Sequence, residues 1–310
     1  MRSRWMWQSS SSGILVGLCR RSRRERPMRE VERPVSEGAR AMGLFDVHAH
    51  LTDRRLAPNA DALVERARAA GVTTIISNGL NPADNQATLD LAARYDIVRP
   101  ALGLYPVDAV LPEMLAAGVE YPRETDEPPP SAEEAIEWLE DHLDQAFAIG
   151  EIGLDHYWVP EELWVRQESV FRRLVRLAID ADKAIIIHTR KAERRTLEVL
   201  EEEGATRVNW HCFSSKVKLA VRIAAAGHHL SIPANVRKAQ NFQRMVERVP
   251  REKLLLETDC PYLGPVRGEL NEPANVAGTA DYVAEAWGCS RLAVDEQLAS
   301  NFEALFGVRP

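Results

Sequence analysis

From residue 44 to the end of the chain, short apolar runs alternate with segments whose apolar positions recur at helical spacing. The apolar runs are nearly continuous and rich in β-branched residues, which favours strands that are buried on both faces of a parallel sheet. We expect eight strands, at residues 44–50, 73–79, 97–106, 146–155, 184–190, 207–213, 228–234 and 253–261.

The segments between these runs place apolar residues three and four positions apart, as an amphipathic helix requires. The clearest of them are residues 59–71, 82–95 and 161–182. Eight strands that alternate with helices over roughly 250–270 residues predict an α/β protein of the (β/α)8 class, a TIM barrel. An open doubly wound sheet is the alternative. It should have a glycine-rich phosphate turn after its first strand, where this sequence has "AHLTDRR".

One connection is unusual. Residues 107–130, which follow the third expected strand, are long and acidic and end in three prolines. In a barrel this connection lies over the end at which enzymes of this class do their chemistry. It is either a lid or specificity loop, or a tolerated surface insertion, and the sequence leaves both interpretations open.

The chain divides into two parts of opposite charge. Residues 1–42 hold ten arginines and four glutamates, a net charge of +6, whereas the remaining residues have a net charge of −13. We expect residues 1–42 to be a disordered basic N-terminal extension, with translation beginning at Met42, and residues 43–310 to be a single TIM-barrel domain. The acidic second part argues against tight, sequence-independent coating of nucleic acid, but not against an enzyme that holds a few phosphates at a metal.

The search for targeting segments and the spacing of the cysteines bear on where the protein acts in the cell. The stretch "GILVGL" is short for a signal peptide and is followed by arginines instead of a small-residue cleavage site. No uncharged apolar run approaches the ~20 residues of a membrane-spanning helix, so we expect no membrane association. The four cysteines have no CxxC spacing and fit neither a zinc finger nor a disulfide framework. A cytoplasmic location is the simplest inference.

Two histidines, His48 and His50, end the first apolar run in "LFDVHAHLTD". Because side chains on a strand alternate between faces, these two imidazoles share one face. Taken alone, the pair is equally consistent with a polar turn after an edge strand. Four more ionisable residues lie late in other expected strands, namely Glu151, His188, His211 and Asp259. Since the carboxyl ends of parallel strands meet at one end of a barrel, we expect all six side chains to converge there.

Metal binding explains such a cluster, because unpaired polar groups at a barrel mouth would each cost on the order of a few kcal/mol. Imidazoles and carboxylates suit zinc, manganese or iron, and four histidines with two carboxylates exceed what one tetrahedral ion needs. Two ions about 3.5–4 Å apart would use all six ligands, with one carboxylate as a bridge. The surplus positive charge of such a pair favours an anionic substrate such as a phosphate.

Six stretches of the sequence resemble, in order and separation, the motifs of the TatD family of metal-dependent hydrolases. They are "DVHAHL", "IGEIGLD", "IIIHTRKA", "HCFS", "LLLETDCPYL" and "RGELNEP", and the similarity covers residues 44–308. The resemblance implies that the metal ligands are His48, His50, Glu151, His188, His211 and Asp259. It also implies that Glu151 bridges the ions and that Asp259 accepts a proton from the attacking water, which makes these two carboxylates the expected catalytic residues.

The sequence departs from the family at positions that concern the substrate. Tyr105 in "GLYP" stands where many members have a histidine, and it would either hydrogen-bond a substrate oxygen or pack at the rim. Lys191 follows "HTR" where an aspartate is common, and with Arg190 it makes a basic pair suited to a phosphate. For Lys191, a solvated position at the start of a helix is an equal alternative.

Other residues near the motifs have structural interpretations. Glu257 is either a support for a metal ligand or a buried ion-pair partner. Cys212 and Cys260 each follow an expected ligand and should point away from it, into the layer between barrel and helices. The "RGELNEP" motif contributes three residues that we expect to order a loop, Arg267, Asn271 and Glu272.

These features favour a deoxyribonuclease that cleaves phosphodiester bonds with a metal-activated water and uses two Mg, Mn or Zn ions as cofactors. The expected substrate is DNA, single-stranded or at ends, and the expected state is a monomer. A hydrolase of small amides, esters or lactones on the same binuclear barrel is the main alternative. A non-catalytic binding protein on a degenerate barrel is the third, although an intact set of six ligands weighs against it.

Overall fold

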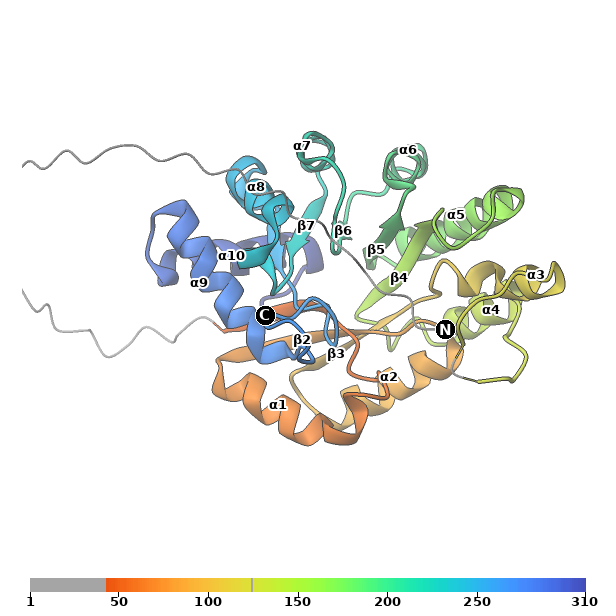
Figure 1. Ribbon diagram of the computed structural model, residues 1–310, viewed down its shortest axis with the longest axis horizontal. Coiled ribbons are helices and arrows are strands. Elements are labelled where there is room, and N and C mark those ends of the chain that lie inside the picture. Colours follow the sequence, from red (N-terminus) through yellow and green to blue (C-terminus); the bar gives the residue numbers. More distant parts are fainter. Residues whose placement is uncertain (1–42, 124) are drawn as a thin grey trace, which may run out of the picture. The chain divides into compact units, whose positions relative to one another are not determined.

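The computed structural model describes residues 43–123 and 125–310, and its central feature is one sheet of eight parallel strands (Figure 1). Each strand pairs with the next one in the sequence, from the first to the eighth. The strands are β1 (Leu44–Ala49), β2 (Val72–Asn78), β3 (Val98–Leu102), β4 (Ala148–Asp155), β5 (Ala184–Arg190), β6 (Val208–Trp210), β7 (His229–Ile232) and β8 (Leu254–Leu256). All eight expected strands are present, although several are shorter than predicted.

The sheet closes on itself where the first and last strands end. Ala49 in β1 and Cys260, which follows β8, form a parallel bridge. The backbone N–H of His50 donates to the carbonyl oxygen of Cys260 at 2.9 Å, and the N–H of Asp259 donates to that of His48 at 2.8 Å. The fold is therefore the predicted (β/α)8 TIM barrel, and the open-sheet alternative is wrong.

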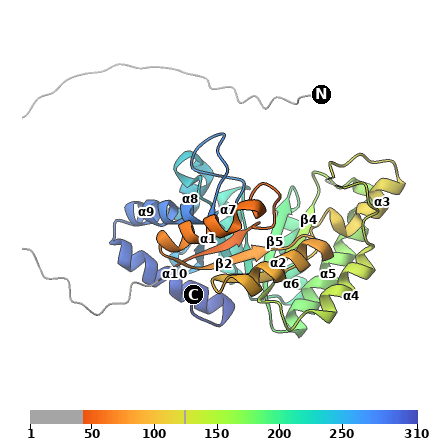
Figure 2. The ribbon, with the colours of Figure 1, turned by 90° about the horizontal axis from the view of Figure 1, so that it is seen from below.

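Helices surround the barrel, and Figure 2 shows α1 and α2 lying across β2 on one side of it. The helices expected at residues 59–71, 82–95 and 161–182 correspond to α1, α2 and α5. The complete set within the described residues is α1 (Ala60–Ala69), α2 (Pro82–Arg94), α3 (Leu111–Ala116), α4 (Ala132–Asp141), α5 (Trp164–Asp180), α6 (Glu193–Glu203), α7 (Val217–Ala225), α8 (Gln240–Arg248), α9 (Val276–Trp287) and α10 (Arg291–Phe306).

Local sequence explains where several helices begin and end. The Asn81 side chain accepts the N–H of Asp84 at 3.2 Å at the start of α2, and Ser131 and Glu134 form a capping box before α4. Helix α6 ends at Gly204, whose φ of 74° lies in the left-handed region that glycine adopts without strain. These signals position the helices, and with them the connections at the barrel ends.

An apolar core fills the barrel and the layer between strands and helices. Its largest fully buried side chains include Trp210 at the end of β6, Phe171 in α5 and Phe302 in α10. Burying one such side chain contributes on the order of 2–3 kcal/mol. Strands packed in this way hold the residues at their carboxyl ends in fixed positions.

The acidic connection after β3 has structure of its own. It contains α3 and a small apolar cluster formed by Val107, Val110, Leu111, Met114 and Val159. Val159 belongs to the connection between β4 and α5, so the two connections pack against each other at the same end of the barrel. The described part of residues 107–130 therefore has apolar packing of its own.

Two strands end earlier than the sequence predicts. Strand β6 ends at Trp210 and β8 at Leu256, so His211 and Asp259 lie beyond the strand ends and not within them. The reason is backbone conformation, because Cys212 and Asp259 have φ angles of 44° and 55° in the left-handed region, which no extended strand continues through. Alternation along a strand therefore explains the placement of His48 but not of these two residues.

The expectations for residues 1–42, a disordered basic extension and a translation start at Met42, lie outside the described residues. Within residues 43–123 and 125–310, which belong to one compact unit, every helix is too short or too polar to cross a lipid bilayer.

Candidate metal centre

A first group of side chains converges where β1, β4 and the segment after β8 meet. The Nε2 atoms of His48 and His50 are 3.2 Å apart, and Oε2 of Glu151 lies 3.5 Å from each of them. Oδ1 of Asp259 lies 3.7 Å from His48 Nε2 and 3.6 Å from His50 Nε2. Four side chains from distant parts of the sequence thus direct nitrogen and oxygen atoms at one small volume.

A second group shares Glu151 with the first. The other carboxylate oxygen, Oε1, lies 2.7 Å from Nδ1 of His188 and 2.9 Å from Nε2 of His211. These two nitrogens are 3.5 Å apart. His188 comes from β5 and His211 from the turn after β6, so Glu151 directs one oxygen at each group. All six residues that the sequence analysis selects are brought together.

The spacing and chemistry of these atoms fit divalent cations. With metal–ligand bonds of about 2.1 Å, neighbouring ligand atoms are about 3.4 Å apart in a tetrahedron and about 3.0 Å apart in an octahedron. The donor atoms of the first group are separated by distances between 3.2 and 3.7 Å. Among the described residues, the clusters of potential ligand atoms that lie within 4.8 Å of one another are His48 with Glu151 and His211, and His48 with His50 and Asp259, which together include five of the six side chains. The second group has three donors, which leaves positions for water or substrate.

Two of the imidazoles are oriented by partners on the side away from the centre. Nδ1 of His50 lies 3.2 Å from the carbonyl oxygen of Asn78, and Nε2 of His188 lies 3.2 Å from Oδ2 of Asp155. An N–H donated to either oxygen leaves the other ring nitrogen unprotonated and facing the centre. Metal-ligating histidines are usually held in this way.

Burial and close contacts shift the pKa values of these residues. Burial raises the pKa of Glu151, but the imidazoles beside it, His211 above all, outweigh burial and hold it well below its usual value. Burial lowers the pKa of His50, but the neighbouring carboxylates, Asp259 above all, raise it to about 9, and carboxylates likewise raise the pKa of His188 to about 9. A divalent cation can replace these protons, so cation binding at neutral pH is coupled to proton release.

Glu257 supports the turn that carries one candidate ligand. Its Oε1 accepts the backbone N–H of Cys212 at 2.8 Å, and its Oε2 accepts the hydroxyl of Ser231 at 2.5 Å. Burial raises the pKa of Glu257 to about 8. Because Cys212 directly follows His211, the carboxyl supports the turn that carries that residue, and it forms no ion pair within residues 43–123 and 125–310. Cys260 is buried in the apolar core and Cys212 packs against it, as expected.

Two further carboxylates, Asp46 and Asp155, support the centre but were not predicted from the sequence. Asp46 accepts the backbone N–H of Thr258 at 2.8 Å and that of His48 at 3.2 Å, and so joins β1 to the segment that carries Asp259. Asp46 could have been found from the sequence, since it lies two residues before His48 on the same strand and therefore on the same face. Asp155 closes the motif "IGEIGLD", and a carboxylate at a strand end is a usual outer partner of a ligating histidine.

Two glycines allow the backbone to come close around Glu151. A Cβ atom at Gly103 would lie 2.4 Å from the backbone nitrogen of Glu151, and one at Gly153 would lie 1.9 Å from the carbonyl oxygen of His188. Gly153 also has a φ of 151°, a conformation that residues with a Cβ atom rarely adopt. Only glycine therefore permits β3, β4 and β5 to place Glu151 and His188 as they are.

The three expected substrate contacts lie near the second group. The ring of Tyr105 is 4.9 Å from that of His188, and it also packs against the apolar cluster of the acidic connection. Arg190 and Lys191 lie against the ring of Tyr157, with Cζ at 3.7 Å and Nζ at 4.7 Å from the ring centroid. Neither side chain has a carboxylate partner among the described residues.

Two of the three residues expected from the "RGELNEP" motif, Asn271 and Glu272, order the segment after β8, whereas Arg267 is exposed and, within the described part of the chain, contributes no hydrogen bond or ion pair to it. Asn271 is buried and donates its amide to the carbonyl oxygens of Thr258 and Tyr262, both at 2.7 Å. Glu272 pairs with Arg66 of α1 at 2.8 Å. These bonds hold the loop that follows Asp259 against the barrel.

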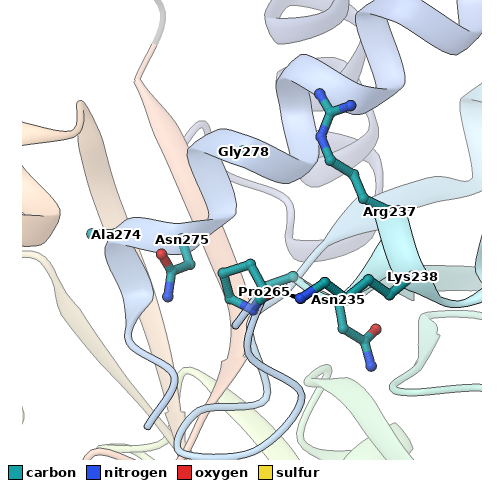
Figure 3. Close-up of a pocket in the computed structure, with 8 residues that line it drawn as sticks. Asn235, Arg237, Lys238, Pro265, Ala274, Asn275 and Gly278 are labelled. Atoms are coloured by element: carbon teal, nitrogen blue, oxygen red, sulfur yellow. Dashed lines mark hydrogen bonds between the residues drawn. The ribbon is translucent and has the colours of Figure 1, made fainter. Parts of the chain in front are cut away.

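A separate cavity of about 240 Å³ opens between the connections that follow β7 and β8 (Figure 3). Arg237 in its wall forms an ion pair with Glu285 at 2.6 Å, and Lys238 donates to the carbonyl oxygen of Pro265. Since both cations are already engaged, this cavity is poorly suited to an anion. The six-residue centre is the stronger candidate for chemistry.

A parallel barrel that gathers four imidazoles and two carboxylates at the carboxyl ends of its strands has the architecture of a metal-dependent hydrolase. The sequence matches the family model described as TatD related DNase over residues 45–307. The chain belongs to this family, as the resemblance of its motifs predicts.

Individual relatives agree with this assignment. Deoxyribonuclease TATDN3 of Homo sapiens is 30% identical over 272 residues, which cover 86% of this chain and 96% of that protein. The metal-dependent hydrolase YabD of Bacillus subtilis is 32% identical over 252 residues, which cover 78% of this chain and 90% of that protein. The crystal structure of YJJV, a TatD homologue from Escherichia coli, superposes with a TM-score of 0.73 at 25% identity and covers 86% of this chain and 98% of that one.

Proposed function

We propose that this chain is a deoxyribonuclease that hydrolyses phosphodiester bonds at a centre of two divalent cations. The observation that supports this most is the position of Glu151, whose two oxygens face two different groups of nitrogen donors. DNA as the substrate is supported by relatives such as human TATDN3, which is named a deoxyribonuclease. In this proposal the first cation is held by His48, His50, Glu151 and Asp259, and the second by Glu151, His188 and His211.

The two carboxylates have different roles in the proposed reaction. Bound divalent cations orient a phosphate, lower the pKa of water and stabilise a leaving oxygen. Glu151 is 2% exposed and engaged through both oxygens, which suits a bridge, whereas Asp259 is 8% exposed at the mouth. Burial raises the pKa of Asp259, but His50 and its neighbours outweigh burial and lower it. Asp259 is therefore ionised at neutral pH and is the better placed of the two to accept a proton from the attacking water.

Three side chains are proposed to contact the substrate. Arg190 and Lys191 carry positive charge that no described carboxylate neutralises, so they suit phosphate oxygens. Tyr105 lies beside His188 and would direct its hydroxyl at a substrate oxygen.

The finer properties of the enzyme are also proposals. We expect the cations to be Mg, Mn or Zn, because the centre combines imidazoles with carboxylates. We expect single-stranded DNA or DNA ends as substrate, and a monomer that acts in the cytoplasm. Free cysteines at positions 212, 260 and 289 are compatible with a reducing compartment.

The test is metal-dependent cleavage of oligonucleotides by the variants His50→Ala and Asp259→Ala. Each should lose activity by at least about 100-fold, because each removes a ligand of the first cation. Circular dichroism should show an unchanged fold. His142→Ala is a matched control, since His142 stacks on Trp138 at the end of α4, far from the centre. Undiminished cleavage by rigorously purified, chelator-treated protein would contradict the proposal.

The same assay distinguishes the carbonyl hydrolase alternative. Oligonucleotides and a panel of amide, ester and lactone substrates are compared at equal concentrations of protein and Mn²⁺. We expect a higher kcat/KM on oligonucleotides. A higher value on a carbonyl substrate would replace the nuclease with that alternative.

A further inference from the structure

Two aromatic side chains stand exposed on the connection that follows β4. Tyr157 is 41% exposed and Trp158 is 37% exposed. Aromatic side chains usually bury 150–250 Å² each, so the exposure of two successive rings leaves a sizeable apolar surface in water. The position of these two rings relative to the candidate centre indicates which ligand would cover them.

Asp155 links the two rings to the candidate centre. Its Oδ1 accepts the backbone N–H of Tyr157 at 2.8 Å and that of Trp158 at 2.9 Å. Its Oδ2 lies 3.2 Å from Nε2 of His188. One buried carboxylate therefore holds both a candidate metal ligand and the turn that carries the two rings.

Positive charge is gathered on the same ring surface. Arg190 and Lys191 both lie against the face of Tyr157. Several other described arginines are neutralised by carboxylates, as Arg195 is by Glu168 at 2.7 Å. An aromatic ring attracts a cation without cancelling its charge, so Arg190 and Lys191 stay available to an anion.

Further aromatic contacts brace the turn. The ring of Trp158 meets those of Tyr157 and Tyr121 edge to face, with centroids 5.1 and 5.4 Å apart. Tyr121 belongs to the acidic connection after β3. The rings are therefore held by neighbours on two connections and are not free to collapse onto the surface.

A second exposed ring follows the candidate ligand Asp259. Tyr262 lies three residues after Asp259 and is 51% exposed, and Cζ of Arg55 is 4.7 Å from its ring centroid. Arg55 forms an ion pair with Asp53 at 2.6 Å, so its charge is already neutralised, unlike that of Arg190 and Lys191.

We propose that Tyr157 and Trp158 form a stacking platform for an unpaired nucleobase, in which Trp158 offers the ring face and Tyr157 holds Arg190 and Lys191 toward the adjoining phosphate. Tyr262 offers a second exposed ring beside Asp259. The inference rests on the proposed function, because the platform then positions the adjoining phosphate at the candidate cations. Aromatic rings beside a basic surface bind single strands with little sequence preference, since every base has a flat face.

The platform predicts selectivity for unpaired bases. A base inside a duplex is covered on both faces by its neighbours and cannot stack on a protein ring unless it leaves the helix. We therefore expect tighter binding of a single-stranded oligothymidylate than of a duplex of equal length.

The test compares an oligothymidylate with the same oligomer that carries an abasic nucleotide on either side of the scissile bond. Loss of a stacked base should lower kcat/KM of the wild-type protein by about 5- to 30-fold. In the double variant Tyr157→Ala/Trp158→Ala, the ratio of kcat/KM for the intact oligomer to that for the abasic oligomer should fall to within about twofold of unity, because the base has lost its partner. Tyr157→Phe should retain the ratio, since phenylalanine preserves the ring.

The comparison separates stacking from a merely structural role. A substitution that only disturbs the turn would slow both oligomers equally and leave their ratio unchanged. Ile179→Ala is the matched control, because Ile179 is an exposed apolar residue at the opposite end of α5. A double variant that discriminates against the abasic oligomer as strongly as the wild type would overturn the platform.

Binding without turnover keeps this inference distinct from the proposed function. If the wild-type protein hydrolyses neither oligomer nor bis(p-nitrophenyl) phosphate, the nuclease proposal is wrong. The platform is then judged by fluorescence anisotropy of a labelled oligothymidylate bound to the chelator-treated protein. The double variant should bind about 5- to 30-fold more weakly than the wild type. Equal affinity in the two proteins, or equal wild-type affinity for duplex and single strand, would contradict the platform.

Discussion

Replacing Asp155 by asparagine removes one negative charge behind His188 and leaves the shape of the side chain nearly unchanged. Asp155 is fully buried, and its Oδ2 lies 3.2 Å from Nε2 of His188. Asparagine keeps one oxygen for the N–H groups of Tyr157 and Trp158, but it turns an amide N–H toward the imidazole. The imidazole then loses its acceptor and its preference for the orientation that faces the centre.

The expected effect on cation affinity follows from that lost bond. A hydrogen bond to a charged group contributes about 1.5–3 kcal/mol, and loss of an outer partner of a ligating histidine lowers metal affinity by about 10–100-fold. We therefore expect Asp155→Asn to raise the dissociation constant for Mn²⁺ by about 10–100-fold, or about 1.4–2.7 kcal/mol.

Isothermal titration calorimetry of the chelator-treated protein measures this affinity directly. Asp61→Asn is the matched control, because Asp61 is an exposed carboxylate on α1 that pairs with Arg94. It should leave the affinity within about twofold of the wild type. If Asp155→Asn folds normally and binds Mn²⁺ as tightly as the wild type, the role assigned to Asp155 is wrong.

Three further substitutions test other parts of the structure. His229 in β7 is buried, and burial together with the positive charge of Lys253 lowers its pKa to about 4. The unfolded chain therefore takes up a proton at higher pH than the folded one, and the free energy of unfolding falls by up to about 3 kcal/mol as the pH falls from about 6.5 toward 4. His229→Leu should reduce the loss of unfolding free energy between pH 7 and 4.5, measured by urea denaturation, and an equal loss in both proteins would contradict this. Gly153→Ala would place a Cβ 1.9 Å from a carbonyl oxygen and should lower Tm by about 5–10 °C, whereas Gly278→Ala, with nothing within 4 Å, should leave Tm equal or slightly higher. Tyr105→Phe should lower kcat/KM for DNA by about 5- to 10-fold without changing Mn²⁺ affinity, because it removes one hydrogen bond to the substrate. Unchanged kinetics would assign Tyr105 to packing alone.

The barrel and the convergence of the candidate ligands follow from patterns that are local in the sequence. Buried parallel strands appear as apolar runs, and the rule that their carboxyl ends meet places His48, Glu151 and His188 together without knowledge of any contact. The close contact of the Nε2 atoms of His48 and His50 follows from alternation along β1.

The turns after β6 and β8 could not be predicted in this way. The left-handed conformation of Asp259 is stabilised by a hydrogen bond from its N–H to the carbonyl oxygen of His48, more than two hundred positions earlier in the chain. No local propensity encodes a bond of that kind. The sequence therefore predicted that Asp259 lies at the centre, from its place near a strand end, but not the turn that carries it there.

The exposed rings beside the centre were missed for a related reason. Tyr157 and Arg190 are remote in the sequence, and they meet because β4 and β5 pair with Asp155 opposite Arg190. A strand register is set by the whole barrel, so the contact becomes visible only once the strands are aligned. The same is true of the apolar cluster that orders the acidic connection, in which Val159 comes from the next connection along the chain.

The proposed bridging of two cations by Glu151 can be tested by anomalous X-ray diffraction from crystals soaked in Mn²⁺. We expect two anomalous peaks about 3.5–4 Å apart, one beside Oε2 of Glu151 with His48 and His50, and one beside Oε1 with His188 and His211. A single peak, or two peaks of which neither contacts Glu151, would contradict the bridge.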